Sequence, residues 1–270
     1  MLLEGKNLVK TYKHKDIWGE NKSHNALNSV DFSLKNGEFC AIVGESGSGK
    51  STLARILSGV VTPTSGEVTL DEKPIKSKKN GRSKELCKDV QLVLQDSKSA
   101  LDPRFTIYDC IAEPVRNLLK LSKKEETQRV LSLMDKMELS RELLKRKPHA
   151  LSGGQQKRVC IARALAAEPK ITIFDEATSG LDVIVRKNIL DLLLKLHNET
   201  NATYLFITHD IEVALYIANR ILVMKNGSIV EQVEYMGDTA CFAHPYSQLL
   251  LKSMLTETPT QSCSICQKAV

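Results

Sequence analysis

The sequence predicts an α/β fold with a mainly parallel sheet, and three short apolar runs carry that prediction. The runs cover residues 38–43, 169–175 and 204–208, and each has the length of a buried strand. Helical patterns follow the first run and separate the second from the third, an alternation typical of parallel sheets. Since the ends of parallel strands gather at one edge, where ligands bind, we expect functional residues directly after these runs.

The chain of 270 residues is long enough for one α/β domain with an inserted or appended subdomain. Its composition, 42% hydrophobic and 26% charged, excludes wholesale disorder, a collagen-like chain and a coiled coil. A net charge of +6 is too small to indicate nucleic-acid binding. No apolar run reaches the roughly 18 residues of a membrane span, and the first residues lack a signal-peptide pattern. We therefore expect a cytoplasmic protein that meets membranes only through partners.

The first strand leads into a phosphate-binding motif that matches G-x-x-x-x-G-K-[ST]. Glycines let backbone N–H groups wrap around a phosphate, and the following helix adds its positive end. We expect Lys50 to reach the outer phosphates and the Ser51 hydroxyl to bind Mg²⁺. The alternative is a plain glycine–serine turn, against which the strand–loop–helix context argues. The predicted nucleotide-binding residues are Gly44, Glu45, Ser46, Gly47, Ser48, Gly49, Lys50, Ser51 and Thr52.

The second and third strands each end at candidate catalytic residues. The second ends with Asp175 and Glu176. We assign the Mg²⁺ contact to Asp175, and Glu176 is placed to activate an attacking water as a general base. A solvated turn is the alternative for such a pair of acids. The third strand ends at His209, which is either structural or close enough to the γ-phosphate to hold that water.

A second glycine-rich segment, Leu-Ser-Gly-Gly-Gln at residues 151–155, precedes a helical stretch and makes a second anion site. This segment is similar to the signature of the ATP-binding cassette (ABC) family. The resemblance implies that family's P-loop ATPase fold, with a mainly parallel core sheet, an antiparallel β subdomain and an inserted helical subdomain. It also implies two cassettes that enclose two ATP molecules, with each signature acting on ATP held by the partner. The signature residues concerned are Ser152, Gly153, Gly154 and Gln155.

Further positions match the family pattern, and the resemblance alone implies their roles. Gln95 matches the glutamine that contacts Mg²⁺ and the water, and His209 matches the switch histidine. Tyr12 matches the aromatic residue that stacks on adenine, although Trp18 is a second candidate.

The segment at residues 179–182 matches the D-loop of the family, so Asp182 is expected among the nucleotide-binding residues. Gly180 stands where alanine is usual. Its added backbone entropy is expected to loosen the loop by roughly 1 kcal/mol.

Residues 95–104, 111–114 and 244–250 resemble the peptide/nickel importer branch, and within it the second ATPase subunit of nickel importers. That likeness implies an ATPase, with ATP and Mg²⁺ as cofactors, that powers uptake of nickel or another chelated metal. The same role in a di- or oligopeptide importer stays open. The implied partners are a second ABC ATPase in a heterodimer, two integral membrane permease subunits and an extracytoplasmic substrate-binding protein, with no nucleic acid. The implied location is the cytoplasmic face of the cell membrane, as a peripheral protein.

Two alternatives belong to the same family. A soluble ABC ATPase of DNA repair or translation is disfavoured because the chain has neither a long coiled-coil insertion nor a second cassette. An exporter ATPase is disfavoured only by the importer-like segment after Gln95.

The motifs divide the chain into three parts. Residues 1–95 and 164–235 form the expected nucleotide-binding core with its antiparallel β subdomain, residues 96–163 a helical signature subdomain, and residues 236–270 a partly disordered extension. In the helical subdomain Arg104, Phe105 and Glu113 are implied contacts for the short coupling helix of a membrane subunit.

Smaller elements follow from local patterns. Alternation predicts antiparallel strands at residues 2–10, 26–34 and 66–70, with residues 13–25 as a loop and residues 73–88 as a solvated connection. Pro103 and Pro114 are expected at segment starts or turns.

Towards the end of the chain, residues 183–199 read as an amphipathic helix and residues 220–232 as a hairpin that turns at Asn226-Gly227. The helix residues expected to face the sheet are Ile184, Ile189, Leu192, Leu193 and Leu196. Cys263 and Cys266 make half of a zinc site, without the further spaced cysteines of an iron–sulfur motif.

Overall fold

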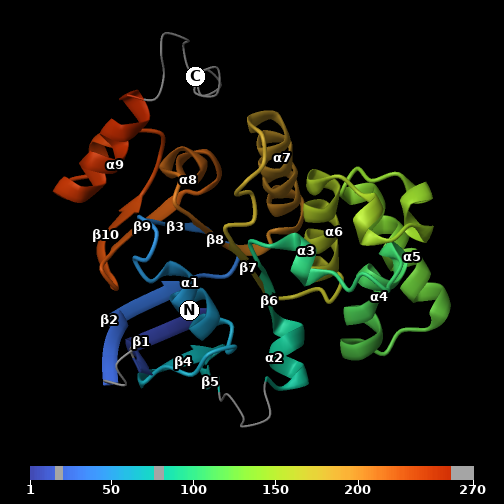
Figure 1. Ribbon diagram of the computed structural model, residues 1–270, viewed down its shortest axis with the longest axis horizontal. Coiled ribbons are helices and arrows are strands. Elements are labelled where there is room, and N and C mark those ends of the chain that lie inside the picture. Colours follow the sequence, from blue (N-terminus) through green and yellow to red (C-terminus); the bar gives the residue numbers. More distant parts are fainter. Residues whose placement is uncertain (16–20, 76–81, 257–270) are drawn as a thin grey trace.

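The computed structural model describes residues 1–15, 21–75 and 82–256, which form two sheets and a set of helices (Figure 1). Trp18, the Cys263/Cys266 pair and the tail predicted to be disordered lie outside the described residues, as does part of the connection at residues 73–88. None of the helices in the described part of the chain is long and apolar enough to cross a membrane.

The smaller sheet is antiparallel, with the strand order β2-β1-β4-β5. Its strands are β1 (Leu3–Lys15), β2 (Asn21–Leu34), β4 (Ser65–Leu70) and β5 (Lys73–Pro74). The predicted loop at residues 13–25 is wrong for residues 13–15 and 21–25, because β1 and β2 continue there and pair Tyr12 with His24 and Lys13 with Ser23. Its centre, residues 16–20, lies outside the described residues. β4 pairs with β1 only as far as Val9, and beyond it Tyr12, Lys13, Ser23 and His24 are exposed, so this polar stretch resembles a loop in sequence.

The larger sheet has the order β10-β9-β3-β8-β7-β6 and confirms the predicted parallel core. Its strands are β3 (Phe39–Val43), β6 (Val90–Val93), β7 (Ile171–Asp175), β8 (Thr203–Thr208), β9 (Arg220–Lys225) and β10 (Ser228–Glu234). All neighbours pair in parallel except β9 and β10, the predicted hairpin.

Alternate residues of the central strands face two apolar cores. Ala41 and Phe206 belong to the core shared with the helices between residues 107 and 217. Ile42 and Leu205 belong to the core shared with α1 (Lys50–Leu57) and the smaller sheet. Burial on both faces explains why these strands read as continuous apolar runs. Cys40 and Cys160 are buried as expected of small hydrophobic residues.

A group of helices lies to one side of the larger sheet (Figure 1). It contains α3 (Ser97–Ala100), α4 (Ile107–Leu118), α5 (Lys123–Lys136), η1 (Arg141–Lys145), η2 (Pro148–Ala150) and α6 (Gly153–Leu165). The predicted boundary between residues 163 and 164 falls inside α6, because this helix runs on to Leu165. Pro103 lies in a turn, but the prediction for Pro114 is wrong, since it is buried inside α4.

The remaining helices are α2 (Lys84–Asp89), α7 (Val183–Thr200), α8 (Ile211–Ile217), η3 (Thr239–Cys241) and α9 (Pro245–Thr256). Lys73–Pro74 and α2 give structure to parts of the predicted connection. In α7 the predicted apolar positions are buried except Ile184, which is 74% exposed because it lies in the first turn, before the helix meets the sheet. α9, which the sequence did not predict, lies beside β10 at the far side of the sheet from α3–α6 (Figure 1).

Candidate nucleotide site

The predicted phosphate-binding loop, Gln95, the Asp175–Glu176 pair and His209 lie at the ends of four neighbouring parallel strands, at one edge of the larger sheet. Val43 pairs with Thr208, Asp175 with Ile207, and Val93 with Phe174. The register therefore places the phosphate-binding loop after β3, His209 after β8, Glu176 after β7 and the Gln95 segment after β6 at adjacent positions. This edge is the ligand-binding edge of an open α/β sheet.

The phosphate-binding loop needs glycine at two positions because its backbone touches other strands. At Gly44, with φ 153°, a Cβ would lie 2.1 Å from the Met224 carbonyl oxygen of β9. At Gly49, with φ 105°, it would lie 2.4 Å from the Ala26 carbonyl oxygen of β2. Both sheets thus hold the loop, and its exposed part, Glu45 to Gly47, can face a ligand.

The loop offers hydrogen-bond donors to an anion. Gly49 is the N-cap residue of α1, and no side chain caps that helix, so the N–H groups of its first turn are not held by a side-chain oxygen. The Lys50 ammonium donates to the carbonyl oxygens of Gly44 at 2.6 Å and Glu45 at 2.7 Å. Burial lowers the pKa of Lys50, while the carboxylates of Glu176 and Asp175 oppose that shift.

An oxygen pair suited to Mg²⁺ lies beside the loop. The Ser51 hydroxyl donates to Asp175 Oδ1 at 2.9 Å, and Asp175 is 4% exposed. Burial raises the pKa of Asp175, and the hydrogen bond from Ser51 counteracts that rise. Hydroxyl and carboxylate oxygens are the donors that Mg²⁺ prefers, so these residues fit the ion.

Glu176 and His209 meet next to this pair. His209 Nδ1 lies 3.5 Å from Glu176 Oε1, and the Glu176 N–H donates to the Ile207 carbonyl oxygen at 2.9 Å. Glu176 has φ 50°, in the left-handed region, which is uncommon for a residue other than glycine. The chain therefore turns sharply after β7, and the carboxylate is held beside a half-exposed imidazole.

The signature residues form a helix cap. Ser152 Oγ accepts from the Gln155 N–H at 3.3 Å, and Gln155 Oε1 accepts from the Ser152 N–H at 3.0 Å. This capping box starts α6. Among the described residues no hydrogen bond or ion pair joins the signature to the phosphate-binding loop.

Lys157, one turn into α6, is a residue whose role the sequence did not indicate. It is 4% exposed, burial lowers its pKa, and its ammonium donates to the Gln95 carbonyl oxygen. A lysine at a buried helix position was the available signal. The contact ties the signature helix to the backbone of Gln95, whose side chain is exposed.

Tyr12 and Asp182 lie on other elements. The Tyr12 ring, 39% exposed on β1, has the Lys10 ammonium 5.2 Å from its centroid. Asp182 caps α7 through the Val185 N–H at 2.9 Å. In the D-loop Gly180 has φ 74°, so the expectation of a loosened loop is reversed: this is a backbone conformation that glycine adopts with the least strain.

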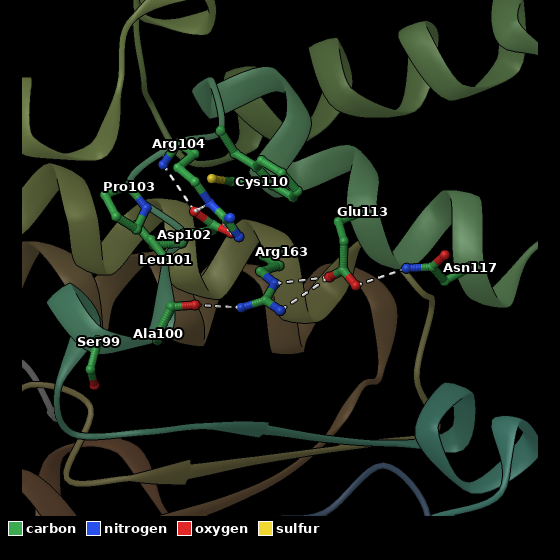
Figure 2. A pocket seen from close by; sticks show the side chains of 11 residues that line it. Ser99, Ala100, Leu101, Asp102, Pro103, Arg104, Cys110, Glu113, Asn117 and Arg163 are labelled. Atoms are coloured by element: carbon green, nitrogen blue, oxygen red, sulfur yellow. Dashed lines mark hydrogen bonds and ion pairs between the residues drawn. The ribbon is translucent and has the colours of Figure 1, made fainter.

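A separate pocket of about 680 Å³ lies between α3, α4 and α6 (Figure 2). Arg163 crosses its floor, donating to Glu113 Oε2 at 3.1 Å and to the Ala100 carbonyl oxygen at 2.6 Å. At the rim Arg104 pairs with Asp102 at 2.7 Å and lowers the pKa of that carboxyl to about 2. Arg104, Phe105 and Glu113, the implied coupling contacts, all line this pocket.

Known proteins resemble the chain over most of its length. Residues 27–179 match the family model described as ABC transporter. The nickel import ATP-binding protein NikE of Escherichia coli K12 is 38% identical over 96% of this chain and 97% of its own length. NikE of Brucella suis is 39% identical over 97% of this chain and 98% of its own length.

Two solved structures share the fold. The dimeric ATP-binding cassette MJ0796, bound to ADP and Pi, superposes with a TM-score of 0.75 at 34% identity, covering 88% of this chain and 100% of that one. The protein cbiO1 from Clostridium perfringens, described as part of the ABC transporter complex cbiONQ, gives a TM-score of 0.74 at 29% identity, covering 94% of this chain and 92% of that one.

Proposed function

The chain belongs to the ABC transporter family, and from this premise we propose that it hydrolyses ATP to power uptake of nickel or another chelated metal through partner membrane subunits. The near full-length similarity to proteins named for nickel import is the observation that supports the proposed cargo. ATP hydrolysis is supported by the position of the phosphate-binding loop, Asp175, Glu176 and His209 at one edge of the larger sheet.

We propose that the phosphates of ATP lie over the loop at residues 44–52, where the N–H groups of α1 and the Lys50 ammonium stabilise their charge. Ser51, Asp175 and Gln95 would hold Mg²⁺, which neutralises charge on the phosphates when bound. Lys50 must exchange its contacts with the Gly44 and Glu45 carbonyls for contacts with phosphate. Its buried position makes that charge–charge contact stronger than it would be in water.

Glu176 is the proposed general base. Its carboxylate would take a proton from the attacking water, and His209, 3.5 Å away, would orient that water towards the γ-phosphate. The buried Asp175, which directly precedes Glu176, is the carboxylate assigned to Mg²⁺. The two neighbouring acids therefore have different tasks because one is buried against Ser51 and the other faces the imidazole.

A second ATPase subunit completes each site in this proposal, and the heterodimer is part of it. Ser152, Gly153, Gly154 and Gln155 would contact ATP bound to the partner, and Asp182 would lie at the same interface. Ser152 and Gly153 are exposed at the start of α6, where such a partner can reach them, and Gly154 and Gln155 are half-buried. Binding of two ATP molecules would close the pair, and hydrolysis would open it.

The pocket between α3, α4 and α6 is the proposed contact with one of two membrane permease subunits, at the cytoplasmic face of the membrane. It presents one half-exposed aromatic side chain, Phe105, beside the charged Arg104 and Asp102. An apolar residue of a short helix can insert where polar partners surround the rim. A substrate-binding protein outside the membrane would deliver the metal to the permeases.

The cargo is tested by uptake in cells that lack this gene, complemented with wild type or with Glu176→Gln. Labelled nickel, free and chelated, is supplied in one arm and a labelled dipeptide in the other. We expect wild type alone to restore metal uptake, because Glu176→Gln should lower hydrolysis at least a hundredfold while ATP still binds. If wild type restores peptide uptake instead, the protein is a peptide importer ATPase. If it restores neither uptake, the result contradicts the importer assignment.

The permease contact is tested with Arg104→Glu, a change at an exposed side chain. We expect the variant to lose most of its association with membranes while the purified chain still binds ATP. Arg141→Glu is the matched control, because Arg141 also forms an exposed pair, with Asp135, on the same group of helices. Equal membrane association of the two variants would place the permease contact elsewhere.

A further inference from the structure

We propose that Tyr246 is a positioning residue of the phosphate-binding loop, which makes the C-terminal helix α9 part of the nucleotide site. The Tyr246 hydroxyl accepts a hydrogen bond from the Glu45 N–H at 3.1 Å, across 201 residues of sequence. Tyr246 is 4% exposed and lies at the start of α9, outside the segment that matches the family model. The loop therefore depends on a residue far from its own motif.

Tyr246 completes a set of contacts that hold the phosphate-binding loop against β9 and the turn that follows it. The Gly44 backbone abuts the Met224 carbonyl of β9, and the Ser48 carbonyl oxygen accepts from the Gly227 N–H at 2.9 Å. Tyr246 holds Glu45, which lies between them. A loop whose N–H groups must converge on a phosphate binds best when its shape is already set, because ordering it on binding costs free energy.

The β9–β10 hairpin holds α9 in place. Glu231 Oε1 of β10 accepts from the N–H groups of Ala243 at 2.7 Å and His244 at 2.8 Å, just before α9 begins. Burial raises the pKa of Glu231, but the hydrogen bonds from Ser247, His244 and Ala243 outweigh it, so the net shift of that pKa is downward. The Lys225 ammonium, at the end of β9, lies 4.5 Å from the centroid of the Tyr246 ring.

This arrangement predicts an effect on nucleotide binding rather than on the chemical step. Glu45 contributes to the shape of the loop both before and during hydrolysis, so loss of its support should weaken ground-state and transition-state binding alike. KM for ATP should rise and kcat should stay nearly constant. ATP and ADP should lose affinity by the same factor.

The test is Tyr246→Phe, which keeps the ring and its contact with Lys225 and removes only the hydroxyl. For the full chain we expect the Kd of ATP with Mg²⁺ to rise about three- to tenfold, the effect of one lost hydrogen bond. The thermal unfolding temperature without nucleotide should fall by no more than about 4 °C, the effect of one lost hydrogen bond. In the assembled complex kcat should remain within about twofold.

Tyr216→Phe is the matched control, because the Tyr216 hydroxyl bonds Asp191 on α7, away from the loop. It should leave the Kd unchanged. An unchanged Kd in Tyr246→Phe overturns the proposal. A raised Kd with an unfolding temperature far below that of Tyr216→Phe also overturns it, because it would assign Tyr246 to general packing. These readouts do not involve the cargo, so a failure here leaves the proposal of metal import untouched.

Discussion

At the scale of single residues, the backbone conformation and surroundings of a position determine whether this site accepts a residue other than glycine there. Gly44 and Gly49 cannot carry a side chain because backbone of neighbouring strands occupies the space. Gly180 differs, since a Cβ there would meet nothing within 4 Å and only its φ of 74° requires glycine. Departures from a family pattern are therefore best judged by the conformation of the position.

Gly180→Ala should lower the free energy of unfolding by about 1 kcal/mol, because alanine is strained at this φ. Gly153→Ala is the control, since Gly153 has neither a positive φ nor an atom near its Cβ. Urea denaturation of both variants measures the difference. Equal stability of Gly180→Ala and wild type would show that the D-loop relaxes without cost.

At the scale of elements, α4 and α5 are joined by a cluster of charges around Glu126. This carboxylate, whose side chain is 7% exposed, accepts from Arg116 at 3.0 Å, from Lys123 at 2.5 Å and from the Tyr108 hydroxyl at 2.9 Å. The hydrogen bonds from Arg116, with smaller contributions from Lys123 and Tyr108, lower the pKa of Glu126 from 4.5 to about 2. The cluster is on the helical side of the molecule, next to the pocket.

Glu126→Gln should destabilise the protein by about 2 kcal/mol at neutral pH, since charge-assisted hydrogen bonds are lost. The folded-state pKa is depressed, so the contribution is full above pH 4.5 and is lost as pH falls towards 2. Urea denaturation of wild type and variant at pH 7, 5 and 3.5 should show the gap narrowing only at the lowest pH. A gap independent of pH would mean that packing, and not charge, is the source.

Elements also differ in how far the sequence predicts them. The strands β3, β7 and β8 and the loop at residues 44–52 have strong local signals, because buried apolar runs and glycine spacing are set by neighbours in the chain. The outer part of β1 and β2 has no such signal, since neighbouring residues such as Tyr12, Lys13, Ser23 and His24 are all exposed and no apolar alternation results. The tie from Lys157 to Gln95 spans 62 residues and depends on packing that no local pattern encodes.

At the scale of the whole molecule, the proposed partner subunit gives Ser152 of the signature a second role besides capping α6, and the two roles can be separated. Ser152→Ala should remove the cap of α6 and cost about 1 kcal/mol of stability. It should also lower the ATPase rate of the assembled complex at least tenfold, if Ser152 contacts ATP of the partner.

Ser122→Ala is the matched control, because Ser122 forms the same capping box with Glu125 at the start of α5. It should cost the same stability, measured by denaturation, and leave the ATPase rate unchanged. Equal rates in the two variants would reduce Ser152 to a helix cap.

The pairing of β3 also has a consequence for how the protein is made. Within the described part of the chain this strand, at residues 39–43, pairs with β8 and β9 alone, which end at residues 208 and 225. At translation rates of about 5–20 residues per second, roughly 10–40 seconds pass between the synthesis of β3 and the completion of both neighbouring strands. The nascent chain therefore carries an unpaired apolar strand, a template for association with other chains, until β9 has been synthesised.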